Sequence, residues 1–260
     1  MLIDTHFHLT DSKYQSKELV IINAREAGVH KLITIGTNIK DNAEVIKLID
    51  HFPNVYGVIG VYPHEDKTMS PIQVGENLEA LLQKSKKIVG VGECGIDVVD
   101  GYEGSSIERQ QNIFKSQLEL AAKHNFPVVI HNRNGDELVI KMLGELKSLN
   151  LRGVIHCFTS DWSSARKFLD LGFMLSFSGI ITYSSGKSIH ETVKNVPKDM
   201  FVLETDAPFL TPQGYRDKIN EPKYITYIAR KVAEIRNENE TYVADCAYKN
   251  SCKLFNLPLD

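Results

Sequence analysis

Eight short runs rich in valine and isoleucine alternate along the chain with segments of helical period, and this alternation limits the possible folds more than any other feature. The predicted strands are Leu2–His8, Lys31–Thr37, Val55–Val61, Ile88–Glu93, Val128–His131, Val154–Phe158, Phe173–Ser178 and Phe201–Asp206. Strands separated by helices pair in parallel. Eight of them close most economically into a (β/α)8 TIM barrel, an α/β fold. An open doubly wound sheet is the alternative, but the sequence has no glycine-rich phosphate loop of the dinucleotide type.

The segments between these strands predict helices, among them Ser16–Ala27, Ile107–His124 and Trp162–Leu171. Gly28 and Gly172 follow two of them, where a helix C-terminus favours a left-handed residue. Two extra C-terminal helices, Pro222–Arg236 and Glu240–Phe255, are predicted after the last strand. A barrel typically needs about 250 residues, and no linker or low-complexity tract divides this chain. We therefore predict a single domain covering residues 1–260.

Histidines and carboxylates occur at or near the C-terminal ends of five of the predicted strands. His6 and His8 are two residues apart in Asp4-Thr5-His6-Phe7-His8, so they project to the same side of a strand. The C-terminal ends of parallel strands meet at one end of a barrel, which is where barrel enzymes carry their active sites. The six candidate metal ligands are His6, His8, Glu93, His131, His156 and Asp206.

A single histidine is more often structural than a metal ligand, but these four lie in or directly after apolar strands. Burying an imidazole there without a strong partner is costly. Cys94 and Cys157 adjoin two of the candidates, and strand alternation turns them toward the helices, so we exclude them as ligands. Glu204 shares the inward face of Asp206. It either orients a histidine or serves as an alternative ligand, or it is a buried acid paired with a lysine or arginine.

Such a set of side chains suits a pair of divalent metal ions. Two cations about 3.5–4 Å apart can share a carboxylate and a hydroxide that attacks the substrate. We predict that Glu93 bridges one ion held by His6, His8 and Asp206 and a second held by His131 and His156. Asp206 is also placed to take the proton from the metal-bound water. Zn, Mn, Co or Ni suits mixed nitrogen and oxygen ligands better than Mg, and the identity of the ions stays open.

With these residues identified, the chain resembles the TatD family of metal-dependent deoxyribonucleases, within the amidohydrolase-like metal hydrolases. The resemblance covers essentially the whole length and rests on Asp4-Thr5-His6-Phe7-His8-Leu9, Gly57-Val58-Ile59-Gly60-Val61-Tyr62-Pro63-His64, Gly92-Glu93-Cys94-Gly95-Ile96-Asp97, His131-Asn132-Arg133, His156-Cys157-Phe158-Thr159, Glu204-Thr205-Asp206-Ala207-Pro208 and Asn220-Glu221-Pro222. It implies that the six candidates are the metal ligands. It also implies hydrolysis of DNA phosphodiesters, often from the 3′ end of a single strand.

The chain departs from the family pattern at several positions. Family members commonly carry a histidine at the position of Tyr62 and an aromatic residue at that of Val98. A glycine is replaced by Asp217 and a cation by Ile219. We expect none of these residues to touch a predicted ligand, so metal binding should be unaffected. The substitutions are expected to weaken the grip on phosphate or the stacking of bases.

Three further residues are predicted to contact substrate. Arg133 follows His131 by two residues, so it should stand at the barrel mouth and clamp a phosphate, unless it forms a salt bridge with a neighbouring loop. His64 lies just past the third strand and could hydrogen-bond the substrate or leaving group, or be structural. Arg216 lies in the long loop after the last strand, where barrels often bind phosphate, although a solvated charged loop is the alternative.

The formal net charge is only −3, so no field of the whole molecule attracts a polyanion, and local groups and metal must hold it. No segment resembles a signal peptide or a membrane span, and the four cysteines show no close pairing. We therefore predict a cytoplasmic protein with single-stranded DNA as substrate, no membrane contact and no obligate protein partner.

Two other functions are compatible with parts of this pattern. An amide, lactone or aminoacyl-ester hydrolase could use the same barrel, although related barrels of that kind often bridge their metals with a carboxylated lysine where this chain has Glu93. A binding protein without turnover should have lost at least one ligand position, and all six are intact.

Overall fold

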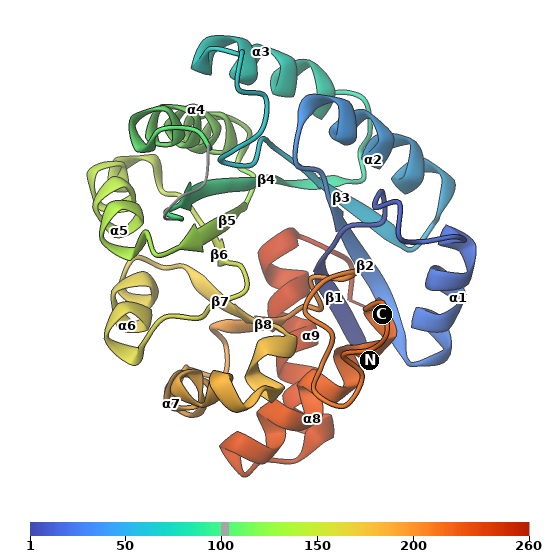
Figure 1. The fold of residues 1–260 in the computed structure, drawn as a ribbon. Helices are drawn as coiled ribbons and strands as arrows, with labels where there is room; N and C mark the ends of the chain where they lie inside the picture. The colour runs from blue at the N-terminus through green and yellow to red at the C-terminus, as the bar shows by residue number, and fades with distance from the viewer. Residues whose placement is uncertain (100–103, 260) are drawn as a thin grey trace.

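The computed structural model describes residues 1–99 and 104–259. Its strands form one parallel sheet whose order follows the sequence, and Figure 1 shows the helices arranged around it. The strands are β1 (Leu2–Phe7), β2 (Val29–Ile35), β3 (Val55–Ile59), β4 (Ile88–Asp97), β5 (Val128–Arg133), β6 (Gly153–Ile155), β7 (Met174–Phe177) and β8 (Phe201–Leu203).

Contacts between the last and first strands close the sheet. The hydroxyl of Thr5 donates to the carbonyl of Leu203 at 2.9 Å. Just beyond the strands, the His8 amide donates to the Ala207 carbonyl at 2.7 Å, and the Asp206 amide donates to the His6 carbonyl at 2.9 Å. The predicted (β/α)8 TIM barrel is therefore confirmed, whereas its organisation as a single domain over residues 1–260 stays a prediction.

Helices follow the strands in alternation. They are α1 (Lys17–Glu26), α2 (Ile39–His51), α3 (Pro71–Leu82), α4 (Ile107–His124), α5 (Asp136–Glu145), α6 (Trp162–Asp170), α7 (His190–Asn195), α8 (Ile225–Arg236) and α9 (Glu240–Phe255). Gly28 and Gly172 have φ angles of 84° and 86°, the left-handed conformation predicted for them. The helix predicted from Pro222 begins as the 3-10 turn Pro222–Tyr224 and becomes an α-helix at Ile225. No helix in the described parts of the chain has the length and apolar character needed to cross a membrane.

The prediction was wrong about where several strands end. β4 continues past Glu93 to Asp97, whereas β8 ends at Leu203, before Asp206. Gly95, within the extension of β4, has a φ of 148°, and a Cβ there would collide with the backbone carbonyl of His131. Glycine allows this close approach and this φ, so the strand continues where a run of bulky residues could not.

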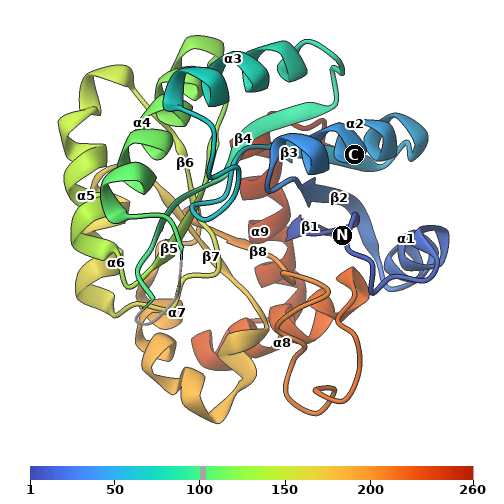
Figure 2. The ribbon, with the colours of Figure 1, turned by 45° about the horizontal axis from the view of Figure 1, so that its top comes forward.

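Below the C-terminal ends of the strands, the barrel interior is apolar and is joined to α9. Every strand contributes at least one buried residue to this cluster, namely Ile3, Ile33, Ile35, Val58, Val89, Val129, Val154, Met174 and Val202. Tyr248, Cys252 and Phe255 of α9 belong to the same cluster, and α9 packs against β1 and β8 (Figure 2). On β5, β6 and β8 the next residue on the inward face is polar: His131, His156 and Glu204. The apolar residues of this cluster therefore lie directly below the polar side chains of the candidate site.

Candidate metal centre

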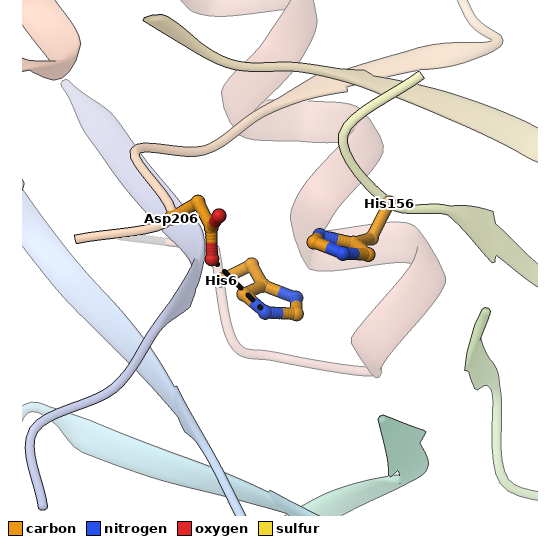
Figure 3. Close-up of side chains that lie close together, drawn as sticks. All are labelled: His6, His156 and Asp206. Carbon is orange, nitrogen blue, oxygen red and sulfur yellow. Dashed lines mark ion pairs between the residues drawn. The ribbon is translucent and has the colours of Figure 1, made fainter. Parts of the chain in front are cut away.

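The structure brings all six predicted ligands together at one end of the barrel. Glu93 lies at the centre of the group. Its Oε2 is 3.5 Å from His6 Nε2, and its Oε1 is 2.8 Å from His131 Nδ1 and 3.2 Å from His156 Nε2. Asp206 Oδ1 lies 3.6 Å from His6 Nε2 and 3.3 Å from His8 Nε2. Figure 3 shows the Asp206 carboxylate directed at His6, with His156 on the other side of the His6 ring.

The two oxygens of Glu93 divide the histidines into two sets. His6 and His8 face Oε2, and we call them the β1 half; His131 and His156 face Oε1, and we call them the β5–β6 half. Donor atoms of His6, His8 and Glu93 all lie within 4.8 Å of one another, as do those of Glu93, His131 and His156, and a third group of His6, His156 and Asp206 joins the two halves. A carboxylate between two such sets is the arrangement that a bridging ligand requires.

In the β5–β6 half, the outward ring nitrogen of each histidine faces a buried carboxylate. His131 Nε2 lies 3.1 Å from Asp97 Oδ2, and His156 Nδ1 lies 3.2 Å from Glu204 Oε1. An ionised carboxylate only accepts hydrogen bonds, so these ring nitrogens must carry protons. The other nitrogen of each ring faces Glu93 and would present its lone pair to a cation that displaces its proton, as the carboxylate–histidine–metal pattern requires.

Glu204 is 1% exposed and also accepts a hydrogen bond from the Cys157 amide at 2.6 Å. Among the described residues its contacts are with His156 and the backbone, and no salt bridge joins it to a lysine or arginine there, which matches the orienting alternative. Cys94 and Cys157 belong to neither donor set. The Cys94 thiol lies in the apolar core, and Cys157 Sγ lies 3.1 Å from Ser178 Oγ.

Sequence reasoning missed Asp97 and misjudged Tyr62. The Tyr62 hydroxyl donates to Asp97 Oδ2 at 2.5 Å and lies 3.4 Å from His131 Nε2. The expectation that Tyr62 touches no predicted ligand is therefore wrong. The reason is the extension of β4, which carries Asp97 alongside β5, and the position of Asp97 four residues after Glu93 on one strand could have indicated it.

The charges of the site are strongly coupled. Burial raises the pKa of Glu93, but the charge of His156 and hydrogen bonds from three histidines outweigh it, so this pKa lies well below its usual value. Burial lowers the pKa of His156, but Glu93 and Glu204 outweigh it and place that pKa well above its usual value. Burial and the charge of His156 lower the pKa of His6. Glu93 is therefore ionised and ready to bind a cation.

The donor set fits a metal. His6 Nε2 and His8 Nε2 lie 3.3 Å apart, and both face Glu93 and Asp206. Two imidazole lone pairs this close repel unless a proton or a cation lies between them. Four imidazoles and two carboxylates meet the ligand preferences of zinc and other transition metals.

A cavity of about 620 Å³ opens over the cluster and extends toward the loops before α1 and α2. Among the described residues, its lining includes Lys17, Lys40 and Phe209, which sequence reasoning did not single out. Lys17 and Lys40 lie in the first turns of α1 and α2, so they follow strands β1 and β2 toward the same end of the barrel. That position after a strand was the signal available in the sequence.

The structure does not bring the three predicted substrate contacts to the described lining of this cavity. Arg133, the last residue of β5, is exposed beside it. His64 Nδ1 accepts a hydrogen bond from the Ser105 amide at 3.1 Å, and Arg216 stacks over the Tyr183 ring at 4.5 Å. Their roles in substrate binding stay predictions.

A barrel with this donor cluster at the C-terminal ends of its strands belongs to the metal-dependent hydrolases. A family model described as TatD related DNase matches residues 3–256, and the chain belongs to that family. It is 33% identical to an uncharacterized metal-dependent hydrolase, YabD, of Bacillus subtilis (strain 168), over 99% of this chain and all of that protein. It is 29% identical to the 3′-5′ ssDNA/RNA exonuclease TatD of Klebsiella pneumoniae (strain 342), over 100% of this chain and 99% of that protein.

A solved structure gives the same result. The TatD homolog YjjV of Escherichia coli K12 superposes with a TM-score of 0.92 at 28% identity, covering 99% of this chain and 98% of that one. The protein is thus a metal-dependent hydrolase that acts on ester bonds.

Proposed function

We propose that this protein is a dinuclear metal-dependent phosphodiesterase that removes nucleotides from the 3′ end of single-stranded DNA. The observation that carries the proposal is the position of Glu93, whose two oxygens face two separate pairs of histidines. One carboxylate shared in this way suits two divalent cations about 3.5–4 Å apart. Relatives named as 3′-5′ ssDNA/RNA exonucleases support nucleic acid as the substrate.

In this proposal each side chain of the cluster has a distinct role. His6, His8 and Asp206 would hold one cation, His131 and His156 would hold the other, and Glu93 would serve both. Bound cations supply positive charge to the phosphoryl group and lower the pKa of water. Asp97 and Glu204 keep His131 and His156 in the tautomers that present a lone pair to the cation.

Asp206 is the group best placed to accept the proton of the attacking water. It lines the cavity, and its side chain is 14% exposed, compared with 6% for Glu93. Burial raises the pKa of Asp206, but the hydrogen bond with His8 and the charges of nearby histidines lower it by more. The carboxylate is therefore ionised. A base must be ionised and within reach of its proton.

The lysines of the cavity supply local positive charge for the substrate backbone. Lys17 and Lys40 line the cavity beside the cluster, and within the described residues no ion pair joins either to a carboxylate. Such cations bind phosphates without reading sequence. Arg133, His64 and Arg216 remain candidates for contacts farther along the strand.

The test is the release of nucleotides from single-stranded oligonucleotides labelled at the 5′ or the 3′ end, with and without added Mn²⁺ or Mg²⁺. Double-stranded DNA, RNA, and ester and amide reporters are assayed in parallel. We expect metal-dependent shortening from the 3′ end, abolished in Asp206→Ala and retained in Asp170→Ala, which removes an exposed carboxylate at the end of α6. Faster turnover of the ester or amide reporter, or equal activity of Asp206→Ala, contradicts the proposal.

A further inference from the structure

An exposed aromatic ring lies at the edge of the metal cavity. Phe209 is 42% exposed, and among the described residues it is the one phenylalanine whose side chain is exposed to this degree. A single exposed apolar residue needs no explanation by itself. This one, however, lines the cavity over the candidate metal ligands, and its ring centroid is 5.9 Å from that of His8.

The backbone of Phe209 is held rigidly. Its amide donates to the Asp206 carbonyl at 2.9 Å, and its carbonyl accepts a hydrogen bond from the side chain of Asn220. Asn220 is fully buried and also donates to the Thr205 carbonyl at 2.9 Å. The backbone that carries the ring is therefore tied to Asp206 and Asn220, next to the candidate metal ligands.

A lysine lies over the ring. Lys13 Nζ is 4.2 Å from the centroid of Phe209, and Lys17 and Lys40 line the same cavity. No ion pair to a carboxylate is formed by these three lysines in the described parts of the chain. The lining also carries acids, namely Asp11, Asp41, Glu44 and Glu65 besides the two candidate ligands Glu93 and Asp206. A flat apolar face and a lysine ammonium thus lie side by side, next to the candidate site for divalent cations.

We infer that Phe209 is a stacking platform for the nucleobase next to the scissile phosphodiester, with Lys13 as the cation that leaves the ring and binds the adjacent phosphate. The inference rests on the proposed function, since it names a subsite for the same substrate. An aromatic face accepts any base, which gives affinity without sequence preference. A long exposed lysine side chain moves at little expense, and a phosphate offers it a stronger partner than a ring does.

The test measures binding separately from turnover. Seven-nucleotide single-stranded DNAs with a fluorescent label at one end and a phosphorothioate at the last linkage of the other end are titrated into the metal-loaded protein. Each is made with a normal terminal nucleotide or with an abasic one beside the modified linkage, at the 3′ end in one series and at the 5′ end in a second. Phe209→Ala, Phe209→Leu and Phe209→Trp are compared with wild type.

We expect Phe209→Ala to weaken binding of a base-bearing end by about 5- to 100-fold, the range found for loss of one base–aromatic contact. The same variant should change binding of the abasic end less than about twofold, because the stacked base is what the ring contributes. Phe209→Trp should retain affinity, and Phe209→Leu should lose most of it, because leucine is apolar but not planar. Tyr242→Ala is the matched control, since Tyr242 is an aromatic residue of similar exposure, 44%, on α9 away from the cavity.

Equal losses for base-bearing and abasic ends, or no loss at either end, overturn the inference, as does a wild-type protein that binds neither. The wild-type protein could instead bind the base-bearing end in preference to the abasic end, with that preference lost in Phe209→Ala, and yet release no nucleotide. That result supports the stacking platform and contradicts the proposed exonuclease. The two ideas can therefore fail separately.

Discussion

The two halves of the candidate metal centre hold their histidines differently. In the β5–β6 half, a buried carboxylate faces the outward nitrogen of each ring: Asp97 for His131 and Glu204 for His156. In the β1 half, the partner of His8 Nδ1 in the described parts of the chain is the Ile35 carbonyl at 3.3 Å. His6 Nδ1 is buried and has no hydrogen-bond partner among residues 1–99 and 104–259.

This difference has a physical consequence for the cations. A carboxylate that accepts a hydrogen bond from the outer nitrogen of a histidine fixes its tautomer and raises the basicity of the ligating nitrogen. A backbone carbonyl has a smaller effect, and a histidine without such a partner gains neither. The β5–β6 half should therefore bind its cation more tightly than the β1 half. Asp206 adds a carboxylate to the β1 half, but its side chain is more exposed than that of Glu93. We therefore expect the cation of the β1 half to exchange more readily and to lie nearer the substrate.

The largest effect is expected for the residue that both halves share. Glu93→Gln removes the negative charge between the two pairs of histidines, so both cations should be lost. Metal content should fall from about two ions per chain to below one, and activity should fall by more than about 100-fold, the upper range for loss of a supporting carboxylate. Mass-spectrometric metal analysis and turnover measure these quantities. The control is Glu145→Gln on α5, and two retained ions would contradict the bridging role.

Asp97→Asn tests the β5–β6 half alone. We expect affinity for the cation of this half to fall about 10- to 100-fold, because the neutral amide no longer stabilises the His131 tautomer. The β1 half should keep its affinity. Calorimetric titration with Mn²⁺ separates the two binding steps, and ¹⁵N shifts of His131 in the Zn²⁺-loaded protein report which ring nitrogen carries the proton. Equal weakening of both steps would argue against separate halves.

Removal of metal should follow the same order. A chelator added stepwise is expected to take the cation of the β1 half first, leaving about one ion per chain together with most of the thermal stabilisation. A ligand at 100 times its Kd stabilises the fold by about 2.7 kcal/mol, which for a chain of this size is roughly 5–10 °C in Tm. Melting temperature and metal content are followed together. Loss of both ions in one step would contradict the comparison.

Protonation offers a finer test of the two halves. Burial lowers the pKa of His131 and of His156, but contacts with carboxylates raise both pKa values by more. Both pKa values therefore lie above the usual value for histidine. In the β1 half that of His8 is raised, and that of His6 is lowered. When the pH is below the pKa of a ligating histidine, a cation must displace a proton to bind. When the pH is above that pKa, there is no proton to displace. Binding to the β5–β6 half should therefore release more protons near neutral pH and weaken more steeply as pH falls. Calorimetry in buffers of different ionisation enthalpy counts those protons.

Much of this arrangement could be predicted because it depends on strand period alone. His131, His156 and Glu204 follow an apolar residue by two positions on the inward face of their strands, so alternation was enough to place them. Asp97 and Tyr62 could not be placed in the same way. Their contact depends on β4 continuing through Gly95 beside β5, a tertiary approach that the local pattern does not encode.

The lining of the cavity shows the same limit. Lys17, Lys40 and Phe209 come from three separate loops or helix starts, and only the closed barrel brings them to one edge. Arg133 was predicted to stand at the barrel mouth because it lies two residues after His131. It is the last residue of β5, where it pairs with Asp97 of β4, and it is exposed outside the described lining of the cavity.

The smallest effect is expected for Tyr62→Phe. The hydroxyl of Tyr62 shares Asp97 Oδ2 with His131, so its loss leaves the carboxylate in place but less firmly oriented. The hydroxyl acts on the cation only through Asp97 and His131, so the cation of the β5–β6 half should bind about 2- to 10-fold more weakly, less than for loss of the carboxylate itself. Tyr227→Phe is the matched control, because it removes one hydroxyl hydrogen bond, to Tyr215, outside the cluster. An effect of Tyr62→Phe as large as that of Asp97→Asn would mean that the hydroxyl, and not the carboxylate, sets the orientation of His131.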